Sequence, residues 1–316
     1  MSRKLSSVFA TAALMSSTAL ADVPNVVVDI APVHSLVARV MQDVGAPDLI
    51  IRSGASPHDY RLRPSEAKAL QDANLVIWMG KELTPWMEDA VKTLSTEAAI
   101  LTLLEKDETT LLEFRESVLF EEHDHDDHSD KEHAETEDQD HDEHAHGAHD
   151  PHAWLSPENA KIWLNLIAAQ LSTADPDNAS TYFVNAAAAM TEIDTLMADV
   201  STMLDPVRGN SFIVFHDAYQ YFETVFEFPA SGAISLGDAT DPSPARIARV
   251  QDRIQERKIQ CVLAEPQFKK GLVVTVLEGT DAKTSIIDPL GVALEPGPAL
   301  YPQLIRNMAK TLVDCF

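Results

Sequence analysis

The metal-binding side chains of this 316-residue sequence are concentrated in one segment, Glu121–Asp150, which carries eight histidines and fourteen acids against one lysine. Imidazole and carboxylate groups are the side chains that hold divalent metal ions in proteins. The segment cannot form an apolar core, so we expect it to be disordered without metal. We predict that it is an auxiliary zinc-binding store; the alternative is an acidic segment that aids solubility. Its histidines are His123, His125, His128, His133, His141, His144, His146 and His149.

Four further histidines lie in sequence of ordinary composition, and three of them occupy places where ligands bind. His58 and His216 follow predicted strands, and His152 precedes a predicted helix. Asp288 also follows a predicted strand. Ligands of open parallel sheets bind beyond the carboxyl ends of the strands, and three imidazoles with a carboxylate or water suit tetrahedral Zn²⁺. Each has an alternative role: His58 and Asp288 in turns, His216 in the core, and His152 as the last histidine of the histidine-rich segment. His34, which opens a helix, is expected to cap or line a cleft.

These residues need a scaffold, and short apolar runs alternate with helical patterns in the first half of the chain. Continuous apolar strands separated by helices are typical of a parallel sheet covered on both faces. The sequence therefore predicts an α/β fold. The expected strands are 25–30, 48–52 and 75–79, and the expected helices are 34–44, 64–73 and, with Ser156 as N-cap, 157–171.

A long helical pattern precedes the second half. No proline or glycine occurs from Asp177 to Leu204, and apolar residues recur at helical spacing. About 28 residues of helix span roughly 42 Å, which suits a rigid connection between two lobes; one domain with a long helix is the alternative. The apolar positions are Phe183, Ala186, Met190, Ile193, Met197, Val200 and Leu204.

The α/β pattern then resumes, with strands expected at 211–215, 259–264 and 284–287 and helices at 244–257 and 301–313. We predict two lobes, each with a mostly parallel sheet flanked by helices and joined by the long helix. The predicted boundaries are a signal peptide at 1–21, a first lobe at 22–174 that includes a disordered loop at 121–150, a linker helix at 175–206 and a second lobe at 207–316.

Charge, the N-terminus and the cysteines limit the protein class. The formal net charge of −26 argues against nucleic-acid partners. Arg3 and Lys4, an apolar run and Ala19-Leu20-Ala21 are typical of a cleavable export signal, and no later segment predicts a membrane span. In an oxidising compartment, Cys261 and Cys315 are most simply a disulfide; two free thiols are the alternative.

Several motifs carry a resemblance to a known family. They are Gly54–Tyr60, Leu62–Ser65, His152–Pro157, Phe215–Phe222, Ala264–Phe268 and Leu290-Gly291. In combination, over nearly the whole chain after residue 21, they resemble the periplasmic metal receptors of bacterial ABC zinc importers. The resemblance implies that His58, His152 and His216 bind the metal and that Asp288 supplies a carboxylate in related receptors. Zinc members often have glutamate before the first histidine, where this chain has Pro57, so water or a nearby glutamate can be fourth.

The family also implies a histidine-rich loop before the second histidine and a disulfide in the second lobe. We therefore expect a monomeric, non-enzymatic periplasmic receptor that captures Zn²⁺ between its lobes and delivers it to the permease of an ABC importer. One alternative is an exported zinc hydrolase, with Glu265 or Asp217 as general base, although no HExxH motif occurs. A manganese or copper receptor and an adhesin are further alternatives.

Overall fold

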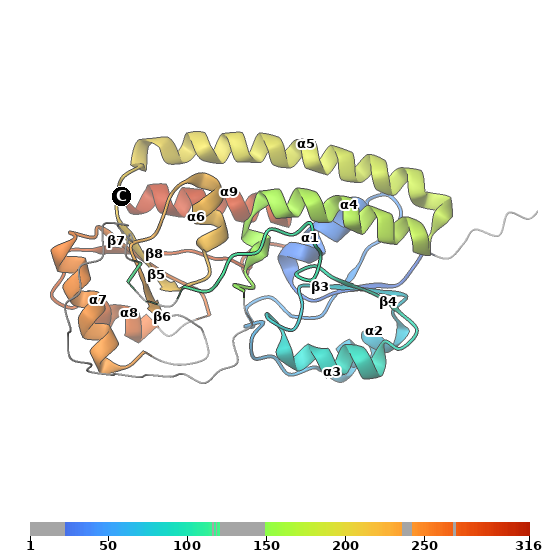
Figure 1. The fold of residues 1–316 in the computed structure, drawn as a ribbon, viewed down its shortest axis with the longest axis horizontal. Coiled ribbons are helices and arrows are strands. Elements are labelled where there is room, and N and C mark those ends of the chain that lie inside the picture. The colour runs from blue at the N-terminus through green and yellow to red at the C-terminus, as the bar shows by residue number, and fades with distance from the viewer. Residues whose placement is uncertain (1–22, 116, 118, 121–148, 236–241, 268–269) are drawn as a thin grey trace, which may run out of the picture.

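A computed structural model describes residues 23–115, 117, 119–120, 149–235, 242–267 and 270–316. The predicted signal peptide and the histidines of the segment other than His149 lie outside these residues. The described chain forms two α/β lobes, as predicted, beneath a layer of long helices (Figure 1). No described helix combines the length and apolarity needed to cross a bilayer.

The first lobe contains a parallel sheet of strand order β2-β1-β3-β4. Strand β3 is buried along its whole length, which explains its continuous apolar sequence. Arg63 precedes the proline that opens α2, and Glu66 accepts the Arg63 backbone N–H at 2.7 Å. The elements are β1 (Val26–Val28), α1 (Ala31–Val40), β2 (Asp48–Leu49), α2 (Pro64–Asp72), β3 (Leu75–Trp78), α3 (Pro85–Leu94), β4 (Ala99–Thr102), η1 (Ala153–Leu155) and α4 (Pro157–Ala174).

The second lobe repeats this topology, because its parallel sheet has the order β6-β5-β7-β8. In each sheet the order reverses between the first and third strands, and such a switch point is where ligands bind in open α/β sheets. The elements that follow α4 are η2 (Pro176–Asn178), α5 (Ala179–Leu204), η3 (Asp205–Val207), β5 (Phe212–His216), α6 (Gln220–Phe226), β6 (Ala233–Ser235), α7 (Pro244–Glu256), β7 (Cys261–Ala264), α8 (Lys270–Leu277), β8 (Lys283–Ile286) and α9 (Leu300–Cys315).

The long helix α5 has 26 residues and lies along both lobes (Figure 1). The predicted positions Ala186, Ile193, Val200 and Leu204 are buried, whereas Phe183 is exposed and its neighbour Tyr182 is buried instead. The Tyr182 hydroxyl donates to the buried Asp175 carboxylate at 2.8 Å. Ion pairs between Arg39 and Glu192 and between Arg306 and Asp199 add to the packing of α5 on α1 and α9.

The lobes meet in one continuous apolar core rather than only through α5. Trp154 of the first lobe donates its indole N–H to the Pro289 carbonyl of the second at 2.8 Å. Tyr301 at the start of α9 donates its hydroxyl to the Trp154 carbonyl at 3.0 Å, and its backbone N–H donates to Ser35 Oγ at 2.9 Å. Opening the lobes widely would therefore expose buried apolar surface and break these bonds.

The predicted disulfide between Cys261 and Cys315 is present, with 5.9 Å between the two Cα atoms. Both residues are buried. The bond ties the start of β7 to the end of α9, so it fixes the C-terminal helix to the sheet of the second lobe.

Candidate metal centre

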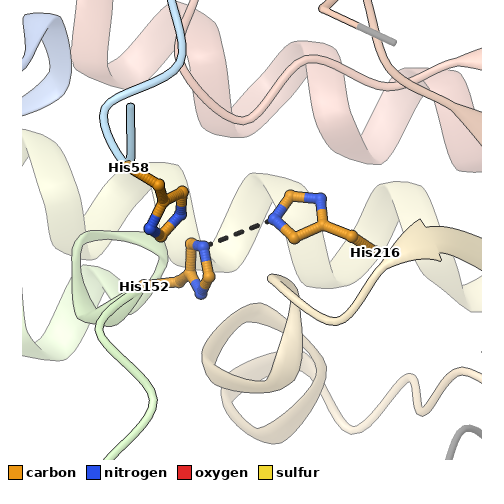
Figure 2. Close-up of side chains that lie close together, drawn as sticks. All are labelled: His58, His152 and His216. Carbon is orange, nitrogen blue, oxygen red and sulfur yellow. Dashed lines mark hydrogen bonds between the residues drawn. The ribbon is translucent and has the colours of Figure 1, made fainter. Parts of the chain in front are cut away.

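Three histidines that are far apart in the sequence converge between the lobes (Figure 2). His58 lies in the loop after β2, His152 lies at the entry to η1, and His216 is the last residue of β5. One ring nitrogen from each lies within 4.8 Å of the other two. Ring centroids are 5.4 Å apart for His58 and His152, and 5.2 Å apart for His152 and His216.

Buried carboxylates orient two of the three rings. His152 Nδ1 lies 2.7 Å from Asp150 Oδ1, and His216 Nδ1 lies 2.6 Å from Glu265 Oε1. An ionised carboxylate can only accept, so Nδ1 is the donor in each pair, and in a neutral ring Nε2 then carries the lone pair. A histidine that ligates a metal typically has this kind of partner, which fixes the tautomer and raises ligand basicity.

The remaining nitrogens show what the arrangement favours. His152 Nε2 and His216 Nε2 are 3.4 Å apart (Figure 2). These two atoms are in hydrogen-bond contact, and which of them donates depends on the tautomers of the two rings. In neutral rings the same nitrogens can instead share a divalent cation, because borderline-soft ions accept imidazole nitrogen readily.

Local structure holds each ligand-bearing segment in place. Trp86 on α3 donates its indole N–H to the Pro57 carbonyl at 2.8 Å, which fixes the loop of His58. Ser56 Oγ accepts the His58 backbone N–H at 3.2 Å. The predicted cap of α4 is present, since Ser156 Oγ accepts the Asn159 backbone N–H at 3.2 Å.

The histidines line a cavity of about 20 Å³. This is close to the space that one water-sized occupant requires, so the cavity suits a single ion. The two general bases considered for a hydrolase are also engaged, Glu265 with His216 and Asp217 with Arg115. The lining residues are Ser56, Pro57, His58, His152, Trp154, His216, Glu265, Gln267, Pro289 and Leu290.

The surroundings of the triad are acidic and buried. Asp150, Asp217, Glu223 and Glu265 are each at most 4% exposed. Burial raises the pKa of Asp150 and of Asp217 to about 7, and the charge of Arg115 acts against both shifts. A divalent cation among these groups would favour their ionised forms and lower the pKa values, so metal and carboxylates stabilise each other.

Two residues considered from the sequence lie outside the triad. One carboxylate oxygen of Asp288 accepts the backbone N–H groups of Leu290 and Gly291 at 3.1 and 2.9 Å. Asp288 lines a separate pocket beside α9 and does not belong to the group of converging ligands. His34 is buried in α1, where Nε2 contacts the Pro47 carbonyl at 3.0 Å. Burial lowers the pKa of His34, which favours a neutral structural residue rather than a cap.

Sequence reasoning missed the orienting carboxylates. Asp150 was grouped with the histidine-rich segment, although a carboxylate two residues before His152 is within reach of that ring. Glu265 is the residue that follows β7, and it contacts His216 only because β5 and β7 are neighbours in the sheet. Arg115, which pairs with two buried carboxylates, had one signal: it is the only cation between Lys106 and Lys131.

Comparison with known proteins gives consistent results. The sequence profile of the family described as zinc-uptake complex component A, periplasmic (ZnuA), matches residues 26–315. The chain is 47% identical to the high-affinity zinc uptake system protein ZnuA of Paracoccus denitrificans, over 98% of this chain and 96% of that protein. Identity to the protein of the same name from Brucella abortus is 44%, over 92% of this chain and 91% of that one.

The fold has solved counterparts. A crystal structure described as ZnuA superposes with a TM-score of 0.74 at 21% identity, covering 93% of this chain and 99% of the other. At this identity the likeness supports the two-lobed architecture alone.

Proposed function

Because the chain belongs to the periplasmic zinc-uptake component A family, we propose that it captures one Zn²⁺ ion through His58, His152 and His216. The family is one of solute receptors and not of enzymes. We propose further that the loaded protein acts in the periplasm and delivers the ion to the membrane permease of an ABC importer. The observation that carries the proposal is the convergence of three imidazoles, two of them held by buried carboxylates, on a cavity for one ion.

The fourth coordination position is proposed to hold water. Gln267 lines the cavity, and its Oε1 is buried with no hydrogen-bond partner among the described residues. A metal-bound water donates two hydrogen bonds, so this oxygen is a suitable acceptor. Asp288 is the alternative ligand, and it would first have to release the turn at Leu290 and Gly291. A crystal structure of the zinc-loaded protein distinguishes water from the Asp288 carboxylate in the fourth position.

The donor set favours zinc over manganese. Manganese and magnesium sites are rich in carboxylate and water oxygens, whereas imidazole suits zinc and copper. Copper binds such sites more tightly than zinc by intrinsic affinity, so we infer that supply in the periplasm selects zinc. Competition between the ions in vitro tests the first statement, with weak manganese binding expected.

The histidine-rich segment is proposed as a second, weaker zinc store. Its composition cannot form an apolar core, and ordering such a chain around each ion would cost conformational entropy and lower the affinity per site. Deletion of residues 121–148 keeps His149 and Asp150, which belong to the described fold. This deletion is expected to remove the weak sites and leave one tight site in a calorimetric titration. An unchanged stoichiometry would contradict the storage role.

The central test is the double change His58→Ala/His216→Ala in the protein lacking residues 121–148. We expect tight zinc binding to disappear in a variant that circular dichroism shows to be folded. His34→Gln is the matched control, because this buried histidine contacts the Pro47 carbonyl and lies outside the triad. Nanomolar binding that survives in the double variant would refute the assignment.

Release is proposed to involve small movements near the ligands. The shared core and the bonds of Trp154 and Tyr301 oppose wide separation of the lobes. His58 is the most exposed of the three histidines and lies in a loop, whereas His152 and His216 are buried. We therefore expect a shift of the His58 loop to be the least costly way to open the site.

A further inference from the structure

The segment that follows β4 crosses from the first lobe to the second and returns to the metal site. We call residues 109–115 and 149–152 the strap. Its two runs are paired, with an antiparallel bridge between Glu113 and His149 and a bond of 2.8 Å from the Asp150 N–H to the Leu112 carbonyl. On the first lobe it is held by Asn159, whose Oδ1 accepts the Thr110 N–H at 2.9 Å.

On the second lobe, the strap is fastened to α6. The Tyr221 hydroxyl accepts the Leu112 N–H at 3.0 Å and donates to the Asp150 carbonyl at 2.8 Å, so one group joins both runs. Arg115 donates to Asp217 Oδ1 at 3.1 Å and to Glu223 Oε2 at 2.7 Å. The Phe120 ring covers the guanidinium at 3.8 Å.

These contacts involve residues that adjoin or orient two of the proposed ligands, His216 and His152. Asp217 directly follows His216, and Asp150 holds the ring of His152. The carboxylates of Asp217 and Glu223 are 4% and 3% exposed. Buried acids of this kind need a partner that satisfies both at once, which a guanidinium does through separate N–H groups and an ammonium does poorly.

We propose that Arg115 is a positioning residue for metal release: by clamping Asp217 and Glu223 to the strap, it holds the His216 segment against the His152 segment and slows departure of the ion. This role rests on the proposed zinc-binding function. In this proposal, the side chain that slows zinc release does not itself coordinate the metal.

Two physical effects of Arg115 predict opposite results. As a positive charge near a divalent cation it repels the metal, so its removal would slow release if charge alone mattered. As a clamp it keeps two ligands in register, so its removal speeds release. Arg115→Lys separates the two, because lysine keeps the charge but cannot reproduce the two directed contacts.

The experiment uses the full chain loaded with one equivalent of Zn²⁺, and it measures zinc dissociation by stopped flow with excess chelator. Release from the proposed cleft site should appear as the slow phase of dissociation. We expect its rate to be about ten-fold higher in Arg115→Met than in the parent, with the rate of Arg115→Lys between the two. Tyr221→Phe, which loosens the strap without changing charge, is expected to act in the same direction. Arg306→Met is the matched control, since its ion pair with Asp199 lies on α9 and α5.

The absorption spectrum of Co²⁺-loaded protein distinguishes positioning from loss of a ligand. It should be the same in the parent and in Arg115→Met, because the coordinating atoms are unchanged. Parent-like or slower release in Arg115→Met overturns the proposal, whatever Tyr221→Phe does, and so does an altered cobalt spectrum. If the parent itself binds zinc weakly, it is the proposed function that fails.

Discussion

The carboxylate of Glu265 offers a quantitative test of how the fold prepares a ligand. Its Oε1 accepts the His216 Nδ1–H at 2.6 Å, and the two side chains are 2% and 6% exposed. Glu265→Gln keeps the volume and a carbonyl acceptor but removes the charge. A hydrogen bond to a charged group contributes about 1.5–3 kcal/mol, compared with about 1 kcal/mol for a neutral one.

The expected cost follows from this difference. Losing charge assistance removes about 1 kcal/mol, and loss of the nearby negative charge weakens attraction for the cation by a similar amount after discounting for relaxation. The sum, about 2 kcal/mol, corresponds to a roughly 30-fold weaker zinc affinity, because each ten-fold step is about 1.4 kcal/mol. Partners of metal-bound histidines typically contribute about 10–100-fold.

Competition with a chromophoric chelator measures this affinity in the protein lacking residues 121–148, so that only the proposed cleft site is titrated. Glu192→Gln is the control, because that carboxylate is exposed and pairs with Arg39 on the outer helices. Circular dichroism verifies that both variants fold. A parent-like affinity in Glu265→Gln would show that this carboxylate does not prepare His216 for the metal.

Three other predictions follow from the structure. Replacing Cys261 and Cys315 by alanine should lower the free energy of unfolding by about 4 kcal/mol in denaturant titrations, since the bond joins residues 54 apart, while zinc affinity changes little. Burial raises the pKa of Asp29 to about 7, although backbone N–H groups oppose the shift. The stabilisation that Asp29 contributes is therefore present at low pH and is lost as the pH rises from about 4 to about 7. Asp29→Asn should make the free energy of unfolding of the zinc-free protein, measured in urea, depend less on pH over this range. Zinc affinity should fall as the pH drops through about 6.5, because only neutral imidazole ligates, and calorimetry at several pH values measures this.

Much of the fold was predictable because burial imposes its pattern on the sequence. Strand β3 is apolar at every position since both faces of the sheet are covered, and α5 shows a helical apolar repeat since one side packs on α4 and α9. Five α-helices and strands were not predicted: α3, β4, α6, β6 and α8. Strand β6 has three residues, too few for a periodic pattern, and its place is set by pairing with β5.

The site was predictable only in part, for a related reason. His58 and His216 were found by the rule that ligands follow the strands of an α/β sheet. The partner of His216 is 49 residues away, and only the strand order brings the two together. Asp288 follows a strand in the same way, yet its carboxylate turns back on the chain and caps a turn. Direction of a side chain after a strand is decided by local backbone bonds, which spacing does not encode.

The repeated strand order of the two lobes explains where the ligands come from. In the second lobe the switch point between β5 and β7 presents His216 and Glu265. The equivalent place in the first lobe is closed by Asp29, which follows β1 and accepts the Met79 backbone N–H at 2.7 Å just beyond β3. Since that position is occupied by a structural carboxylate, the first lobe supplies its ligands from loops. One topology thus supplies a proposed ligand directly from a strand in the second lobe, and in the first lobe it supports the loops that carry the other two.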